Sequence, residues 1–198
     1  MIWNKKFEYP TSTRALINGK RHYDVGVHEK LPSVTTILQA TQSEEKRKKL
    51  EEWKARMGAQ RADRIRDISA MRGTSMHTYL EGYITDQRHL DLTALGVEAG
   101  RMANVVIRSG LGDLEEVWGT EVTLYYPGLY AGATDVVGRY GGREAIIDFK
   151  QTNKPKQREW IDDYFTQLAA YAMAHNYVYN TQIQSGIILM CSKDGFFQ

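Results

Sequence analysis

Three charged residues in the second half of the chain have a spacing that could bring them to one point. Asp135 and Asp148 are thirteen residues apart, and the segment 136–147 between them has the pattern of strand, Gly-Gly turn, strand. A tight hairpin of that length would place the two carboxylates side by side, and strand alternation puts Lys150 on the face of Asp148. Two carboxylates and one ammonium at one place would hold a hard divalent cation and position a water beside it. That chemistry suits the hydrolysis of a phosphodiester.

The two aspartates differ in their sequence surroundings. Asp148 lies inside an apolar run, between 145–147 and Phe149, where a carboxylate is costly unless it is paired or binds a metal. A purely structural ion pair with Lys150 is the alternative. Asp135 follows Gly132 by three residues, and we expect a tight entry there that exposes its carboxylate; taken alone, it would be an ordinary turn residue.

Further polar side chains are candidates for the same site. His77 and Glu81 are four residues apart on an expected helix and so share a face, and imidazole is a good ligand for Mn²⁺. Glu121, inside an expected strand, is another candidate carboxylate. Gln167 and Tyr171 form a second i,i+4 pair on a later helix. Helix packing, surface exposure or salt bridging would explain each of these residues equally well when it is taken alone.

Composition excludes several classes of protein. The chain has 198 residues, 42% hydrophobic and 25% charged, which fits one globular domain. Its single cysteine, Cys191, excludes a disulfide partner within the chain and a cysteine-bound zinc or iron–sulfur site. No apolar run approaches the roughly 20 residues of a membrane span. Residues 1–10 lack the apolar core of a signal peptide, so we expect a cytoplasmic protein that binds no membrane.

Charge is distributed unevenly although the net charge is only +2. Residues 43–72 carry ten Lys/Arg against six acids, a local patch that suits a polyanionic partner, although a solvated helix with ion pairs is an equal alternative. We propose the basic helix expected at 43–66 as a bridge over the site, with Arg61 and Arg64 facing nucleic acid. Four aromatic residues near the motifs could stack on unpaired bases, or could belong to the core: Trp53, Tyr79, Tyr83 and Trp160.

Hydrophobic periodicity predicts an α/β protein. The Asn18-Gly19 pair predicts a hairpin within 15–27. Helices are expected at 43–66, 68–86, 92–109 and 158–179, and strands at 117–126, 130–140, 144–150 and 182–190. We interpret 1–198 as a single domain, with a hairpin and basic-helix extension at 1–66 and an αβββαβ core at 67–198. This order predicts a mixed central sheet flanked by helices.

Four motifs in order resemble the PD-(D/E)XK nuclease superfamily, which has a restriction-endonuclease-like core. They are Arg-Gly-Thr-x-x-His at 72–77, Gly-x-x-Asp at 132–135, Asp-Phe-Lys at 148–150 and Gln-x-x-x-Tyr at 167–171. The pattern is most similar to the RecB-like exonuclease branch. The segment Leu-Pro-Ser-Val-Thr-Thr-Ile-Leu at 31–38 narrows the resemblance further. It resembles the single-domain branch that includes mitochondrial genome maintenance exonucleases and related phage and bacterial enzymes.

The resemblance implies a role for each motif. His77, Asp135, Asp148 and the Phe149 carbonyl would bind Mg²⁺ or Mn²⁺, and Lys150 would act on the attacking water. Apart from the resemblance, Glu81 or Glu121 could contribute to a second metal. The resemblance covers about 31–190, and the cluster-binding cysteines of some relatives are missing, so no iron–sulfur cluster is expected. The nucleic-acid contacts expected on this basis, or from the nearby basic and polar sequence, are Ser33, Thr35, Arg61, Arg64, Arg72, Thr152, Gln167 and Tyr171.

The resulting hypothesis is a metal-dependent DNA exonuclease that acts on single strands or ends in replication, recombination or repair, in a bacterial or phage-infected host cell. Two alternatives stay open. One is an endonuclease or flap-processing nuclease of the same fold, and the other is a catalytically inactive nucleic-acid-binding module. The intact Asp135, Asp148 and Lys150 argue against the inactive module, because binding alone gains nothing from a buried carboxylate pair.

Overall fold

The computed structural model describes residues 1–26 and 29–198, and its centre is a five-stranded mixed sheet. The strand order is β1-β5-β6-β7-β8. β1 and β5 are parallel, β5-β6 and β6-β7 are antiparallel, and β7-β8 are parallel. The strands are β1 (Ile2–Trp3), β5 (Leu114–Tyr126), β6 (Tyr130–Tyr140), β7 (Arg143–Thr152) and β8 (Ser185–Ser192). The expected α/β fold with a mixed sheet and flanking helices is confirmed.

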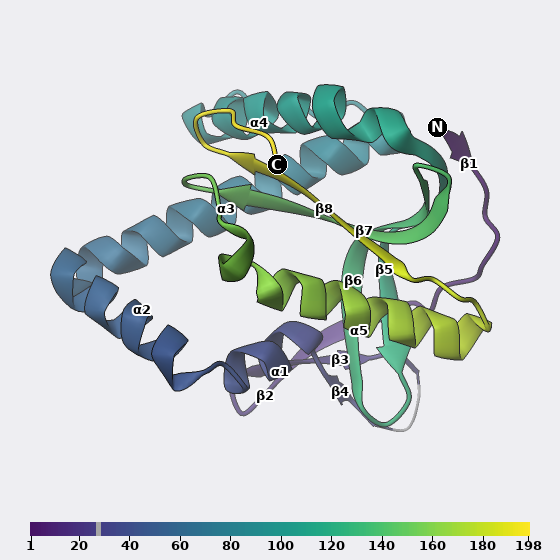
Figure 1. The fold of residues 1–198 in the computed structure, drawn as a ribbon, viewed down its shortest axis with the longest axis horizontal. Helices are drawn as coiled ribbons and strands as arrows, with labels where there is room; N and C mark the ends of the chain where they lie inside the picture. Colours follow the sequence, from purple (N-terminus) through teal and green to yellow (C-terminus); the bar gives the residue numbers. More distant parts are fainter. Residues whose placement is uncertain (27–28) are drawn as a thin grey trace.

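Helices cover both faces of the sheet (Figure 1). On one face, α3 (Ala59–Ile84) and α4 (Ala94–Gly110) bury Met76, Leu80 and Val106 against Ile147 and its neighbours. On the other face, α1 (Val34–Ala40) and α5 (Asp162–Tyr179) form a second core around residues such as Val34, Leu168 and Ile146. Alternate residues of β7 therefore serve different cores, which is the period-2 pattern of a strand buried on both sides. Short 3₁₀ turns, η1 (Leu111–Asp113) and η2 (Arg158–Trp160), precede β5 and α5.

The expected N-terminal hairpin is present as part of a small second sheet. β2 (Thr13–Ile17) and β3 (Lys20–Asp24) are antiparallel and joined at Asn18 and Gly19, which both have positive φ, as a tight hairpin turn requires. Residue 27 of that prediction lies outside the described residues. β4 (Leu31–Pro32) adds a third strand, and the buried Tyr23 packs beside Ala131 of β6.

The boundary expected between the first two long helices is wrong. α2 (Glu44–Met57) ends at Gly58, whose φ of +79° is unfavourable for other residues, and α3 then runs without interruption through 66–68. α2 and the first part of α3 extend beyond the sheet at the left of Figure 1. None of the residues of α2, all of them described, is buried. The basic segment is therefore a projecting helical hairpin rather than one helix.

Smaller differences concern the ends of strands and helices. β5 begins at Leu114 rather than 117, and β8 spans 185–192 rather than 182–190. The helix expected from 158 is divided into η2 and α5. β1 was not expected from the sequence; its Trp3 indole donates to the Ile84 carbonyl at 2.9 Å, which ties the N-terminus to the end of α3.

Candidate active site

The site lies where β6 and β7 separate. The two strands pair from Tyr140–Arg143 as far as Val136–Ile147, one position short of the two aspartates, while β6 continues along β5 and β7 along β8. The gap is filled by Asp135, whose Oδ2 accepts from the Phe149 amide at 2.5 Å. The sequence prediction that a hairpin aligns the two aspartates is therefore correct, and the strand separation leaves room for their side chains.

Asp135 is buried rather than exposed, contrary to the expectation of a tight entry. Gly132 lies within β6, and a Cβ there would lie 2.6 Å from the Tyr171 hydroxyl, so the glycine accommodates Tyr171 rather than a turn. Asp135 Oδ1 lies 3.0 Å from His77 Nδ1 of α3. Burial raises the pKa of Asp135, but the His77 charge and hydrogen bond, with Lys150, bring it below the usual value. Asp135 is thus ionised and fixed from both sides.

Asp148 and Lys150 form a buried ion pair. Burial raises the pKa of Asp148 to about 6, against the attraction of Lys150. Burial by itself would lower the pKa of Lys150, but Asp148 and Asp135 raise it above its usual value, so the ammonium stays protonated. Lys150 can therefore orient a water and stabilise negative charge, but it is a poor general base. Its Nζ also lies 5.2 Å from the centre of the Tyr164 ring.

α5 supports Asp148 from the other face of the sheet. Gln167 Nε2 donates to Asp148 Oδ1 at 3.5 Å and to the Tyr171 hydroxyl at 3.1 Å, so the predicted i,i+4 pair does reach the site. Both residues are almost fully buried, with 8% of Gln167 and 2% of Tyr171 exposed. That they also touch nucleic acid stays a prediction, because packing leaves little of either side chain at the surface.

A second group of ligand atoms gathers around Asp135. His77, Glu121 and Asp135 each offer one atom, and these atoms lie within 4.8 Å of one another. Glu121 has a φ of +50° within β5, a left-handed conformation that is uncommon for a residue with a side chain. Glu121 is exposed at the surface, but the protein atoms crowded around its carboxyl and the nearby Asp135 raise its pKa to about 7. An imidazole and carboxylates in this arrangement fit Mn²⁺ or Mg²⁺.

The other candidate ligands lie beside this group. Glu81 lines the same hollow as His77 and Glu121, but its carboxylate is not among the three converging atoms. The Phe149 carbonyl projects to the same edge of β7 as the Phe149 amide, which faces Asp135. Asp148 is close enough for the charges of Asp135 and His77 to act on its pKa. The structure therefore places the predicted metal ligands around one gap in the sheet.

The raised pKa of Glu121 leads to a prediction for how the stability of the protein depends on pH. Folding raises the pKa of this carboxyl from 4.5 to about 7, so the folded state binds a proton more firmly than the unfolded chain between those values. The contribution of Glu121 to stability is therefore lost as pH rises through 7. In EDTA, Glu121→Gln should destabilise the protein less at pH 8 than at pH 5, or stabilise it there, as measured by urea unfolding at each pH.

The comparison with wild type isolates Glu121 from other groups. Burial lowers the pKa of His175 to about 4, which makes stability rise with pH in the acidic range in both proteins. An equal change in unfolding free energy at the two pH values would contradict the prediction.

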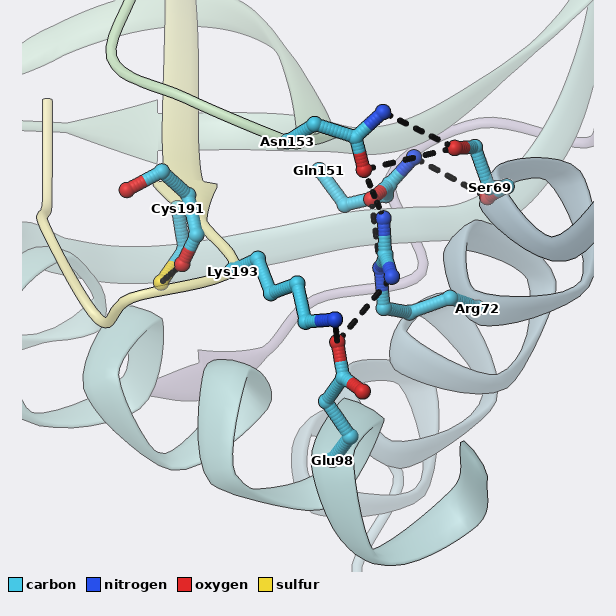
Figure 2. Close-up of polar contacts among 8 residues, drawn as sticks. Ser69, Arg72, Glu98, Gln151, Asn153, Cys191 and Lys193 are labelled. Atoms are coloured by element: carbon cyan, nitrogen blue, oxygen red, sulfur yellow. Dashed lines mark hydrogen bonds and ion pairs between the residues drawn. The ribbon is translucent and has the colours of Figure 1, made fainter. Parts of the chain in front are cut away.

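Arg72 joins three elements beneath the site (Figure 2). Its guanidinium is 2% exposed; Nε donates to Gln151 Oε1 at 2.9 Å, Nη1 to Glu98 Oε1 at 3.0 Å, and Nη2 to Asn153 Oδ1. Gln151 and Asn153 bond in turn to Ser69. The contact of Arg72 with nucleic acid stays a prediction; in the structure its guanidinium fastens α3 and α4 to the residues that follow Lys150.

The remaining residues predicted to touch nucleic acid are divided between surface and interior. Arg61 and Arg64 are exposed on α3, and Thr35 is exposed on α1. Ser33 is 2% exposed and caps α1 by accepting from the Thr36 amide at 3.0 Å, so its side chain has a structural use. The hydroxyl of Thr152 is buried without a hydrogen-bond partner among the described residues.

Two residues were missed by sequence reasoning. Arg14 on β2 lines the hollow that contains His77 and Glu121, and it adds a guanidinium group there. Its only sequence signal was its place in the predicted hairpin. Tyr164 lies three residues before Gln167, on the same face of α5, and that spacing was a usable signal.

Comparison with curated proteins shows which known enzyme this chain is similar to. The chain resembles mitochondrial genome maintenance exonuclease 1. It is 32% identical to the mouse protein over 174 residues, 31% to the human protein over 176, and 33% to the Xenopus tropicalis protein over 175. Each match covers 83% of this chain, and the chain spans about half the length of these relatives (49–51%). No protein-family model matches the chain.

The similarity to mitochondrial genome maintenance exonuclease 1 supports the nuclease interpretation of the site. No helix in the described ranges 1–26 and 29–198 combines the length and apolar content needed to cross a membrane.

Proposed function

We propose that the protein is a divalent-metal-dependent DNA exonuclease of the PD-(D/E)XK superfamily and its RecB-like branch, acting on single-stranded DNA or on DNA ends. The observation that carries the proposal is the Asp148–Lys150 ion pair beside the Asp135–His77 pair at the gap between β6 and β7. The relatives named as exonucleases support it. We keep the single domain at 1–198 and the cytoplasm of a bacterial or phage-infected cell as parts of the proposal; the relatives are named as mitochondrial.

The residues around the gap fit a bound cation. His77, Asp135 and Asp148 would hold Mg²⁺ or Mn²⁺, with Glu121 and the Phe149 carbonyl as further oxygen ligands. When bound, such an ion would lower the pKa of a water molecule attached to it and neutralise negative charge on the phosphoryl oxygens. The proposal includes no iron–sulfur cluster.

The chain's own groups supply orientation and fixed charge. Lys150, protonated and held by Asp148, would direct the attacking water and stabilise the charge that develops on the phosphate. Gln167 holds the second oxygen of Asp148, so the carboxylate keeps its direction. Arg14 stands beside the His77–Glu121 hollow, where a phosphate of the strand could pair with it. The projecting α2–α3 hairpin, with Arg61 and Arg64, is proposed as the bridge over the strand.

Degradation of end-labelled linear single-stranded DNA in Mg²⁺, Mn²⁺ or EDTA tests the proposal. We expect loss of label in either metal and none in EDTA, and we expect a circular strand of the same sequence to be resistant. Cleavage of the circle would favour an endonuclease of the same fold. DNA binding without cleavage in any metal would contradict the proposal and leave a nucleic-acid-binding module.

A further inference from the structure

A groove of about 820 Å³ lies beyond the carboxyl end of β7, between the projecting α2–α3 hairpin and the start of α5. Ligands of α/β proteins commonly bind outside the carboxyl ends of parallel strands, and β7 and β8 form such a pair here. Trp53 of α2 and Trp160 of η2 both line the groove, and apolar side chains of α3, including Ile65 and Ile68, form part of its lining. It is larger than the hollow of about 520 Å³ around His77 and Glu121.

The charge of the groove favours a polyanion. None of the described residues that line the groove is acidic. Four basic residues line it: Arg72, Lys154, Lys156 and Lys193. Arg72 and Lys193 are both directed to Glu98, which lies outside the lining. Lys154 and Lys156 form no ion pair with any described residue. Two lysines at its edge are therefore available to phosphate groups.

The aromatic content favours unpaired bases over a paired helix. Trp160 is 57% exposed and Ile68 is 39% exposed, so flat apolar surface faces the groove without a covering element. Indole faces beside lysines are the combination that binds single strands, because bases stack on the rings while the backbone follows the charge. In a duplex the base faces are already stacked and would not reach the rings.

The groove is continuous with the candidate site. Thr152 lines it and, by strand alternation, shares a face of β7 with Asp148 and Lys150. Its hydroxyl is buried and unpartnered among the described residues, so it has a free hydrogen-bonding capacity at this wall. Tyr164 lines the groove and also lies 5.2 Å from Lys150 Nζ.

We propose that this groove is a base-binding subsite in which Trp53 and Trp160 stack on unpaired bases next to the nucleotide held at Lys150, while Lys154 and Lys156 contact the flanking phosphates. The inference rests on the proposed nuclease function for its substrate. It adds that the enzyme holds its strand by the bases on one side of the cleavage point, and not by the sugar-phosphate backbone alone.

The test is a scan of a short labelled single strand with one abasic sugar moved along it. Affinity is measured by fluorescence anisotropy in EDTA, so that no cleavage occurs. Wild type should lose roughly 5- to 150-fold in affinity at one or two positions, the range expected for one stacked base. Trp53→Ala and Trp160→Ala should lose a similar factor with the intact strand, and an abasic sugar at the matching position should then cost nothing further.

Two controls keep the result interpretable. Neither tryptophan is buried, so both variants should fold, which circular dichroism checks. Tyr177→Ala removes a 61% exposed aromatic residue outside the groove lining and should bind the strand as wild type does. Removing Lys154 or Lys156 should lower the slope of log affinity against log salt by about 0.7 for each phosphate that is no longer neutralised.

Several outcomes would overturn the subsite. They are tryptophan variants that bind as wild type does, an abasic penalty that persists unchanged in both variants, or equal competition by polyglutamate, a polyanion without bases. Because these assays need no hydrolysis, their failure is distinct from that of the nuclease proposal. Metal-dependent cleavage without tryptophan coupling would leave the nuclease and remove the subsite; coupling without cleavage would do the reverse.

Discussion

Lys150→Ala should lower the rate of single-strand cleavage about 10²- to 10³-fold, the loss typical of removing one group that stabilises charge in the transition state. Lys150 is 20% exposed at its side chain and stays protonated, so no solvent cation replaces it in the same geometry. The measurement is a single-turnover rate with enzyme in excess and saturating Mn²⁺. Lys20→Ala, an exposed lysine at the start of β3, is the matched control and should cleave as wild type does.

The variant also removes the partner of a buried carboxylate, so folding must be followed separately. Asp148→Asn combined with Lys150→Met removes both charges at once and avoids an unpaired buried aspartate. If both variants fold and cleave at wild-type rates, Lys150 has no part in the reaction. If DNA binding in EDTA also disappears in a folded Lys150→Ala, its role is binding rather than catalysis.

Arg72→Ala should reduce the free energy of unfolding by about 3 to 5 kcal/mol, the loss expected when one partner of a buried charged network is removed. Glu98 keeps a weaker ion pair with Lys193 at 3.8 Å, so the lower end of that range is expected. Gln151 is half-buried and Asn153 is exposed, so the side-chain oxygens that lose the Arg72 donor can turn to water, which also favours the lower end of the range. Urea unfolding monitored by far-UV circular dichroism measures the effect.

Arg66→Ala is the matched control on the same helix. Arg66 also forms ion pairs, with Asp63 and Asp67, but it is 64% exposed, and such pairs contribute about 0 to 1 kcal/mol. Equal losses from the two arginines would show that the buried network contributes no more than a surface pair. Because Arg72 is five residues before His77 on α3, we also expect its loss to weaken the alignment of His77 with Asp135.

The half of the structure that contains the candidate site was accessible from sequence because its signals are local. The Gly-Gly turn fixes the hairpin that aligns Asp135 with Asp148, and strand alternation fixes Lys150. The i,i+4 spacing was enough to pair Gln167 with Tyr171. In each case the deciding geometry is contained within a few residues or one tight turn.

The errors arise where distant packing decides. Arginine is usually a surface residue, and nothing in the local sequence marks Arg72 as an exception. It is buried and bonded to Gln151 and Glu98 only because α3 docks onto β7 and α4. Gly58 lies in a run of good helix formers, so periodicity carried the predicted helix through it, whereas the backbone breaks there at positive φ. The left-handed conformation of Glu121 has no local signature, since glutamate seldom adopts it.

The lack of buried residues in α2, all of whose residues are described, affects how this sequence can change. Because α2 contributes no side chain to the interior, the stability of the protein places little constraint on its sequence. Surface substitutions there should change the free energy of unfolding by only about 0.5 kcal/mol. Its charges and its tryptophan can therefore vary with what the helix must touch, without endangering the sheet. In the evolution of such a protein, α2 would be the adaptable part, and the strand that Arg72 fastens to α3 and α4 would be the part inherited unchanged.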